Sequence, residues 1–422
     1  MNESIFEKKV IPWIVVLWFL VTIDSFFLWW DFGRIFRFMA LLGIIISTLM
    51  VSNRFRFSTY NLPIFLSLLV YILWLLPFVQ NKNLMLVKIF DFSTFLLLLF
   101  WPKEVLKNCY RLLRKVIIFF AIGSTLVSVL SLVGVLQYLP HFTFDGRSNL
   151  HQSKGIVYYV YGAFVTLHSA NDSLATRACG PVQEPGHWAI IIGLFYLIDR
   201  FALQKRNFWI LISGILTFSS AFLLIFLAVE LLNLFSKASF KTTKQLLFIL
   251  LGFFLVYTIL PQNIKNNISY LFFERNLESV YENYEESESL QSALDARASN
   301  YSIDLYYNLS PHEYWFGRGY RDTSSAISDH RGTILYIGLI GLILSIIPSV
   351  LIIRNAKWRL LIALGFSLFL VYIHRGWMYY TPYIYFLAFM AVTLCMPIEE
   401  SDHYLVKTTE DSFNNDVVLE NP

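Results

Sequence analysis

Long uninterrupted apolar segments, separated by polar loops, are the feature that most restricts the fold of this chain. Each segment runs for about 17–25 residues, the length of an α-helix that crosses the hydrocarbon core of a bilayer. Of the 422 residues, 56% are hydrophobic and 15% are charged, whereas soluble domains average about 45–50% apolar and about 25% charged residues. The alternation of a transmembrane β-strand is missing from these segments. The sequence therefore predicts an all-α polytopic membrane protein.

The apolar segments predict about twelve membrane-spanning helices, if the longest segment holds two. The segments are residues 10–30, 35–51, 62–79, 85–101, 116–139, 188–203, 207–235, 245–260, 332–353, 361–374 and 382–396.

Lysine and arginine concentrate in alternate loops, and cytoplasmic loops of membrane proteins are enriched in these two residues. The basic loops contain Lys8, Lys9, Arg54, Arg56, Lys103, Lys107, Arg111, Arg114, Lys115, Arg200, Lys205, Arg206, Lys237, Lys241, Lys244, Arg354, Lys357 and Arg359. The opposite short loops contain Arg34, Arg37, Lys82 and Arg375. This asymmetry predicts that both termini are cytoplasmic and that residues 140–187 and 261–331 form large extracytoplasmic loops.

Segment 207–235 has basic residues at both ends, so a single crossing would conflict with the charge asymmetry. Its middle contains a polar interruption, Thr217-Phe218-Ser219-Ser220. We therefore expect two short helices that enter the membrane and return. The alternative is one long tilted helix, with the orientation misassigned elsewhere.

The chain is expected to form a single integral membrane domain over residues 1–396, followed by a disordered cytoplasmic tail at 397–422. Residues 272–309 mix acidic and apolar side chains at helical spacing, which predicts one or two surface helices in the second large loop. The cysteines Cys109, Cys179 and Cys395 show no disulfide or metal-binding spacing. No metal or other cofactor is expected.

The stretch RACGPVQEPGHW, residues 177–188, brings polar chemistry to the start of an apolar segment. Its Gly-Pro and Pro-Gly pairs indicate turns, and a helix N-terminus favours anions. Arg177 is a permanently charged fork that suits phosphate, and Glu184 can orient Arg177 or cap the helix. The simpler interpretation is an arginine that snorkels to the membrane surface and a capping glutamate.

A second polar cluster precedes the next apolar segment. It comprises Arg297, the loop WFGRGYRDTSS at 315–325, and His330 at the start of SDHRGTILYIGLIGL. Gly317 and Gly319 allow positive φ or close backbone approach. Gly338 and Gly341 allow a neighbouring helix to pack closely. Histidine transfers protons near neutral pH, although a lone interfacial histidine is more often structural.

These patterns together resemble the O-antigen polymerase and ligase superfamily, which comprises the Wzy-type polymerases and the lipopolysaccharide ligases. The resemblance rests on three patterns in a common order, and it covers roughly residues 120–350. They are Arg177 and Gly180 followed by Glu184-Pro185; Arg297 upstream of Gly317 and Gly319; and His330 followed by Gly338 and Gly341.

The resemblance implies transfer of a glycan from an undecaprenyl pyrophosphate donor to a sugar hydroxyl of a carrier-linked acceptor. The reaction would occur at the outer face of a bacterial inner membrane and would require no metal. Arg177 and Arg297 would bind the pyrophosphate, and His330 would be the base or would position the acceptor. Glu184 would support His330 or act as a rival base. The substrate-contacting residues implied in addition are Arg318, Arg321, Gly317, Gly319 and Tyr301.

The resemblance also implies the binding partners: the donor and acceptor lipids, membrane lipid, a flippase and a chain-length regulator. No nucleic acid is expected to bind. Arg331 follows His330 where the family often has a small amide or hydroxyl residue.

A ligase that transfers the glycan to lipid A remains an alternative, because it uses the same donor. A secondary transporter or flippase is a further alternative, since Lys88 and Asp91 lie three residues apart within one predicted span. A metal-dependent glycosyltransferase is disfavoured, because the outer loops contain no Asp-x-Asp.

Overall fold

The computed structural model describes most of the predicted membrane domain. The described residues are 5–26, 33–55, 60–78, 84–145, 156–169, 172–236, 258, 262, 265, 300–319, 330–375 and 381–396. Most of the predicted span 245–260, the acidic part of the second large loop and the tail 397–422 lie outside these residues.

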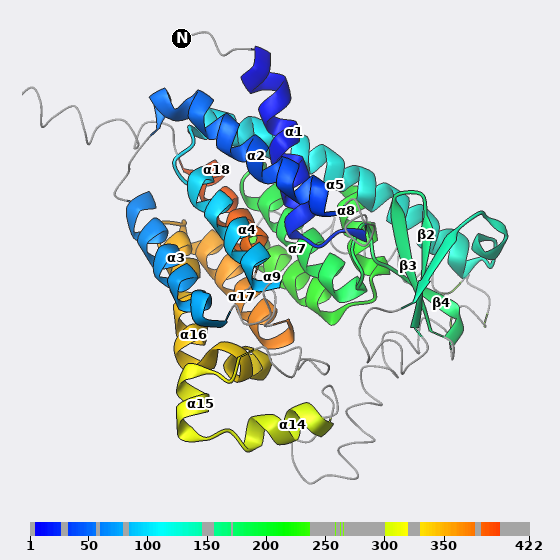
Figure 1. The fold of residues 1–422 in the computed structure, drawn as a ribbon. Helices are drawn as coiled ribbons and strands as arrows, with labels where there is room; N and C mark the ends of the chain where they lie inside the picture. Colours follow the sequence, from blue (N-terminus) through cyan, green and yellow to red (C-terminus); the bar gives the residue numbers. More distant parts are fainter. Residues whose placement is uncertain are drawn as a thin grey trace, which may run out of the picture.

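Helices make up most of the described chain (Figure 1). They are α1 (Ile5–Thr22), α2 (Gly33–Val51), α3 (Asn61–Leu75), α4 (Leu84–Leu98), α5 (Lys103–Leu132), α7 (Pro185–Phe201), α8 (Phe208–Leu216), α9 (Ser220–Ser236), α14 (Asn300–Tyr307), α15 (Pro311–Phe316), α16 (His330–Ile353), α17 (Trp358–His374) and α18 (Pro382–Cys395). Short 3-10 helices occur at Ser52–Arg54, Leu76–Phe78 and Leu136–Tyr138.

Among the described residues, three helical stretches are long and apolar enough to cross a membrane. They are Asn61–Phe78, Lys103–Ser131 and His330–Ile353. Large apolar side chains remain exposed on the outer helices, for example Phe38 and Leu49 of α2 and Phe369 of α17. Such exposed apolar surface is typical of a membrane-facing bundle. The count of twelve spans and their sidedness remain predictions.

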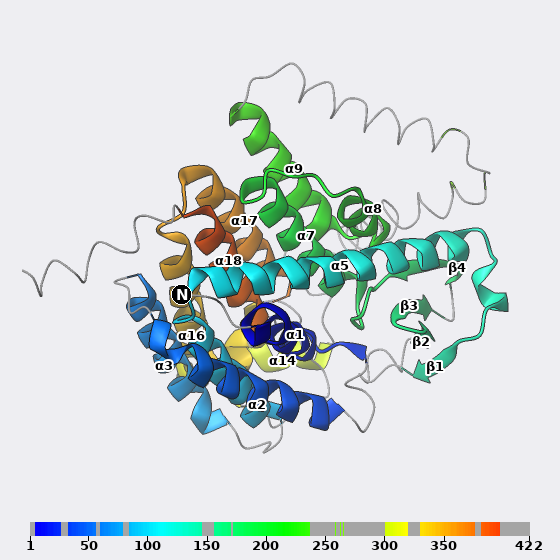
Figure 2. The same cartoon turned by 90° about the horizontal axis from the view of Figure 1, so that it is seen from above.

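Helix α5 starts earlier than the sequence analysis expected. The basic residues from Lys103 to Lys115 were assigned to a loop, but they form the first turns of this 30-residue helix. Val105, Leu106 and Leu113 are buried there. Lysine and arginine are good helix formers, so the basic residues extend the helix while its apolar side packs on the core. Figure 2 shows α5 running across the molecule toward the strands.

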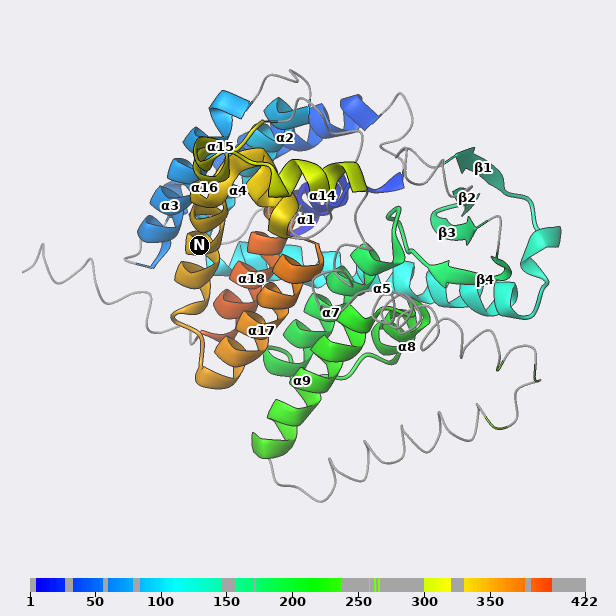
Figure 3. The same cartoon turned by 90° about the horizontal axis from the view of Figure 1, so that it is seen from below.

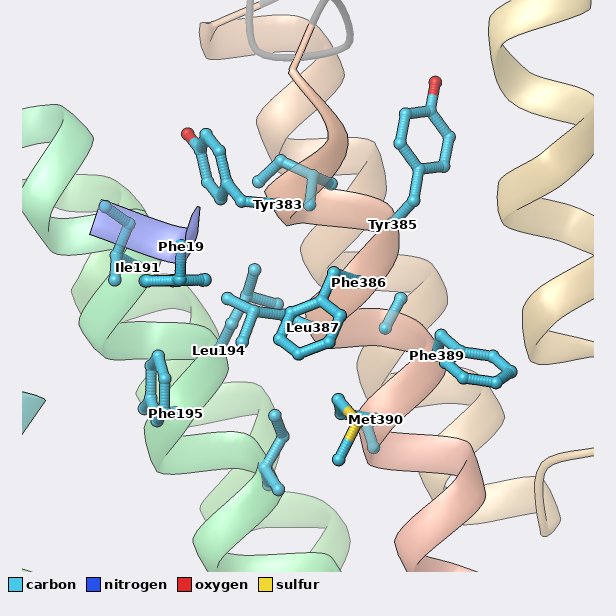
Figure 4. Close-up of a cluster of buried hydrophobic side chains, with 14 of the residues drawn as sticks. Phe19, Ile191, Leu194, Phe195, Tyr383, Tyr385, Phe386, Leu387, Phe389 and Met390 are labelled. Carbon is cyan, nitrogen blue, oxygen red and sulfur yellow. The ribbon is translucent and has the colours of Figure 1, made fainter. Parts of the chain in front are cut away.

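Two helices at the centre, α7 and α18, are apolar on all sides. Every residue of α18 from Pro382 to Val392 is buried, and so are nearly all residues of α7 up to Asp199. Figure 4 shows Phe386 and Leu387 of α18 beside Leu194 of α7. A helix that is hydrophobic all round must be surrounded by other elements. These two helices therefore form the centre of the bundle, and residues of the candidate site lie at their first turns.

The mostly helical fold also contains a four-stranded antiparallel sheet, which the prediction of an all-α fold did not include. The strands β1 (Phe142–Asp145), β2 (Ile156–Tyr161), β3 (Phe164–Ser169) and β4 (Asp172–Ala178) pair in chain order. In β2, Tyr158 and Val160 are buried while Tyr159 and Tyr161 are only partly buried, which is the period-2 pattern of a strand. Sequence analysis interpreted these aromatic residues as a membrane-facing loop, because the strands are short and surrounded by longer apolar runs.

Segment 207–235 forms two helices, as its polar interruption predicted. Helix α8 has nine residues and ends at Leu216, and α9 begins at Ser220. Phe218 lies between them with φ of 48°. Arg206, just before α8, pairs with Glu230 near the end of α9, so the chain folds back on itself. A nine-residue helix rises only about 14 Å, which is too short to cross a bilayer.

Charged pairs close the end of the bundle at which this hairpin begins. Arg114 of α5 donates two hydrogen bonds to Asp199 of α7, at 2.6 and 2.7 Å. Arg200 donates to Glu230 at 2.6 Å. These pairs contain three arginines that the charge asymmetry predicted to lie on the cytoplasmic side. They are Arg114, Arg200 and Arg206.

The opposite end of the bundle, called the site end below, is where α7 and α18 begin and α17 ends. Helix α16 runs antiparallel to α17, and the Tyr372 hydroxyl donates to the Leu342 carbonyl at 3.0 Å. The short helices α14 and α15 lie across this end (Figure 3). Residues far apart in the sequence therefore meet at the site end.

The hairpin generates a prediction about stability. Glu230 accepts hydrogen bonds from Tyr196 and Arg200 and pairs with Arg206, and its side chain is 3% exposed. Glu230→Ala leaves these buried donors without their carboxylate and should lower the free energy of unfolding by roughly 3–5 kcal/mol. Thermal unfolding in detergent micelles, read by circular dichroism, measures the effect.

Arg206→Ala is the matched control for Glu230→Ala. The Arg206 side chain is 23% exposed, so solvent screens its contribution and the loss should be smaller. Equal and negligible shifts for the two variants would contradict the proposed role of the carboxylate.

Candidate functional site

Arg177 lies at the end of β4 and reaches into the break between α8 and α9. Its Nε donates to the Thr217 carbonyl at 2.8 Å, and its Nη2 donates to the Phe218 carbonyl at 2.9 Å. A helix end leaves carbonyl groups without intrahelical partners, and a guanidinium can bind two of them at once. Arg177 therefore holds the break in the hairpin, a role that sequence analysis did not anticipate.

Glu184 is the residue immediately before α7, but its side chain does not cap the helix. The carboxylate instead forms an ion pair with Arg375, which follows the last residue of α17. Gly186 makes room for this contact, because a Cβ atom there would lie 2.7 Å from Nη2 of Arg375. The pair thus joins the start of α7 to the end of α17.

Sequence analysis missed Arg375 as a site residue. The available signal was its position as one of few basic residues in the loops opposite the basic set. That signal identifies the side of the bundle and not the partner, because Glu184 is far away in the sequence.

The sheet contributes Tyr158 of β2 to the same region. The side chain is buried, and it lies near enough to Glu184 and Arg375 to respond to their charges. Burial and then the negative charge of Glu184 raise the pKa of the Tyr158 phenol, while Arg375 lowers it. The phenol therefore stays protonated.

Next to this pair, His187 of α7 is buried and its Nε2 lies 2.8 Å from the Tyr383 hydroxyl of α18. This contact fixes the first turns of the two central helices relative to each other. The resemblance assigned no role to His187, although this residue belongs to the stretch RACGPVQEPGHW.

Lys88 and Asp91, the pair that suggested a transporter, belong to a four-residue network. Lys88 Nζ lies 3.1 Å from Asp24, whose other carboxylate oxygen lies 3.2 Å from Arg37. Arg37 also lies 3.6 Å from Asp91. Two positive and two negative side chains compensate each other here, which connects the end of α1 to α2 and α4.

The glycine-rich loop of the second cluster packs against a break in α16. Gly338 has φ of 73° inside this helix. The backbone N–H groups of Arg318 and Gly319 donate to the carbonyls of Leu335 and Tyr336, at 2.9 and 3.1 Å. Trp74 of α3 donates to the adjacent carbonyl of Ile337 at 3.0 Å.

Gly317 and Gly338 are the closest points of this contact. A Cβ atom at Gly317 would lie 2.5 Å from the Tyr336 carbonyl, and one at Gly338 would lie 2.2 Å from the Trp315 carbonyl. The expected close backbone approach at Gly317 is confirmed. Gly338 was expected to admit a neighbouring helix, and the structure places the C-terminal end of the short helix α15 against it.

Arg318 extends from this loop and pairs with Glu313 of α15 at 3.4 Å. Glu313 also closes a capping box with Ser310. The backbone N–H and the hydroxyl of Ser310, followed by the Arg318 charge, hold the pKa of Glu313 below its usual range. Arg318 is 39% exposed, so an anion from solution can reach it.

His330 is the first residue of α16. Its Nδ1 atom is buried, and it has no hydrogen-bond partner within the described part of the chain. There, His330 also makes no hydrogen bond or ion pair to Arg177 or Glu184. The expected convergence of these three side chains therefore stays a prediction.

Three further residues named from the sequence cannot be placed in the site. Arg297 and Arg321 lie outside the described residues. Tyr301 belongs to α14, but the position of its side chain is also outside the description. Among the described residues, no group of three His, Cys, Asp or Glu side chains is arranged to hold a metal ion.

Comparisons with models of known protein families, with curated proteins and with solved structures find no match to this chain.

The hydrogen bonds of Arg177 generate a second prediction. Arg177→Lys keeps the charge but loses the planar fork, so at least one carbonyl at the helix break should lose its partner. An unsatisfied buried carbonyl costs roughly 1–3 kcal/mol. Arg177→Lys should therefore destabilise the protein nearly as much as Arg177→Ala in thermal unfolding. Full stability of the lysine variant would mean that only the charge of Arg177 matters.

The loop contact at Gly317 generates a third prediction. Gly317→Ala introduces a methyl group against the Tyr336 carbonyl at a φ of 84°. Positive φ costs a non-glycine residue roughly 1–2 kcal/mol, and overpacking adds roughly 1–3 kcal/mol. Gly319→Ala is the matched control, because its φ is 81° but the nearest atom to its Cβ is 4.0 Å away. A larger fall in melting temperature for Gly317→Ala confirms the contact, and equal falls contradict it.

Proposed function

We propose that this chain is a membrane glycosyltransferase of the polysaccharide-polymerase type. It would transfer a glycan from an undecaprenyl pyrophosphate donor to a sugar hydroxyl of a second carrier-linked glycan. The reaction would take place at the site end, on the outer face of a bacterial inner membrane. The donor and acceptor lipids are its substrates.

One observation carries this proposal. The motifs that resemble the family coincide with breaks in helices: Arg177 at the break between α8 and α9, and Gly317 at the Gly338 break of α16. Irregular backbone within a membrane bundle is tolerated where protein or a water-filled cavity surrounds it. In secondary transporters, broken helices form the substrate site, so helix breaks in a membrane bundle can serve substrate binding. A motif match by chance would not be expected to select such positions.

The charges of the site end fit the chemistry of the reaction. The acceptor hydroxyl attacks the anomeric carbon of the donor sugar and gives its proton to a base. The new glycosidic bond forms as the bond from that carbon to the phosphate oxygen breaks. The electron pair of the broken bond remains on the diphosphate, whose growing negative charge arginine side chains stabilise.

We assign His330 as the base or the residue that positions the acceptor, with Glu184 as its support or rival. The Nδ1 atom of His330 supports this assignment. It is buried and has no hydrogen-bond partner among the described residues, so a substrate hydroxyl could bind it. Arg318 is exposed enough to bind a phosphate or sugar. Arg177 acts through the backbone it holds and is a positioning residue. Arg297, Arg321 and Tyr301 keep the roles that the resemblance implies.

The transporter alternative loses its main support. Lys88 and Asp91 are each paired with a residue of another segment, Asp24 or Arg37. Such a compensated network is sufficient to explain two buried charges in the bundle. No described contact distinguishes a polymerase from a ligase, since both take the same donor.

An assay on the reconstituted protein tests the proposal. Full-length protein in liposomes receives carrier-linked oligosaccharide without lipid A, and the products are separated by gel electrophoresis. We expect a ladder of longer chains, which His330→Ala should slow by about 10²–10⁴-fold, the usual contribution of a general base.

His312→Ala is the control for His330→Ala. His312 lies on α15, before the glycine-rich loop, and it is exposed and stacks on Phe316, so its loss should leave the ladder intact. Glycan transfer that occurs only when lipid A is supplied would favour the ligase. Loss of function in Lys88→Ala with normal function in His330→Ala would favour the transporter.

A further inference from the structure

The side chains of Arg375 and Glu184 are partly exposed at the site end, although the carboxylate oxygen that meets the guanidinium is itself buried. The two side chains are 25% and 26% exposed, respectively. In the part of the chain that the structure describes, Glu184 is the acidic residue that Arg375 contacts. A small or flexible anion can therefore approach the guanidinium without unfolding a helix.

Arg375 lies between two helix ends. It follows the last residue of α17, whose partial negative charge favours a cation, and it faces the start of α7, whose partial charge is positive. Its guanidinium lies against the first turn of α7, beside Gly186. The N-terminal turn of a helix carries partial positive charge and repels a cation. The carboxylate of Glu184 offsets both positive charges, and any anion that replaces it must do the same.

A diphosphate would satisfy this position better than a carboxylate does. It carries more negative charge and more acceptor oxygens, and arginine binds phosphate oxygens through two parallel hydrogen bonds. The first turn of α7 adds backbone N–H groups at the same place.

We propose that Arg375 binds the diphosphate of the carrier lipid and that this anion displaces the carboxylate of Glu184. The pair is then an exchange latch: Glu184 holds Arg375 in place until the substrate arrives. The displaced carboxylate is left at the site end, where it can accept the proton of the acceptor hydroxyl. This inference rests on the proposed function for the identity of the anion.

Binding of an unreactive diphosphate tests the exchange directly. The probe is undecaprenyl diphosphate without a glycan, and its affinity for the full chain in lipid nanodiscs is measured by competition with a fluorescent analogue. Arg375→Gln should weaken binding by roughly 10–100-fold, the usual effect of losing hydrogen bonds between charged groups.

The decisive variant is Glu184→Gln. It removes the competing carboxylate and should tighten binding of the probe, by about threefold to tenfold. A purely structural ion pair predicts the opposite, since loss of either partner would disorder the same contact. The double variant Glu184→Gln with Arg375→Gln should bind no better than Arg375→Gln alone, because the gain depends on the guanidinium.

Arg359→Gln is the matched control for Arg375→Gln. Arg359 lies near the start of the same helix, α17, where it packs over Trp358 at the other end of the bundle. Its loss should leave probe affinity unchanged. Melting temperatures of all variants establish that they are folded before affinities are compared.

Two outcomes would overturn the inference. One is weaker binding in Glu184→Gln, and the other is unchanged binding in folded Arg375→Gln. The result is separable from the proposed function. Expected probe binding without any glycan transfer would refute the transferase and keep the latch, whereas normal transfer with probe binding insensitive to Arg375 would refute only the latch.

Discussion

Backbone carbonyls released at breaks in helices must find partners inside the protein, because a membrane bundle offers little water to them. The break after α8 finds Arg177, and the break in α16 finds the N–H groups of Arg318 and Gly319. In the first case the partner comes from strand β4, and in the second it comes from the loop that follows α15. The breaks therefore attach the polar loops to the helices, and the arrangement of the site end follows from these attachments.

Compensation of charge is the second constraint at the site end. Arg375 pairs with Glu184, and Arg37 and Lys88 share the carboxylates of Asp24 and Asp91. An uncompensated charge in such surroundings is costly. The proposed exchange keeps this compensation, because the substrate diphosphate would replace the carboxylate of Glu184 beside Arg375.

Local patterns allowed much of the helical scaffold to be predicted. Apolar length located the helices, and the interruption at Thr217–Ser220 located the turn of the hairpin. The Gly317 contact followed from the lack of a side chain. The sheet was missed because the alternation within β2 is short, and its stability depends on strand partners and on burial beneath other elements.

The role of Arg177 and the participation of Arg375 were not predictable in the same way. A guanidinium that binds phosphate and one that binds backbone carbonyls look identical in a sequence, because each requires only a permanent cation with parallel donors. The sequence by itself determined a mostly helical, apolar chain and the break at Thr217–Ser220, but not the break at Gly338. The tertiary structure alone decided which partners these residues have, because hydrogen bonds and ion pairs depend on distances that only packing of remote segments establishes.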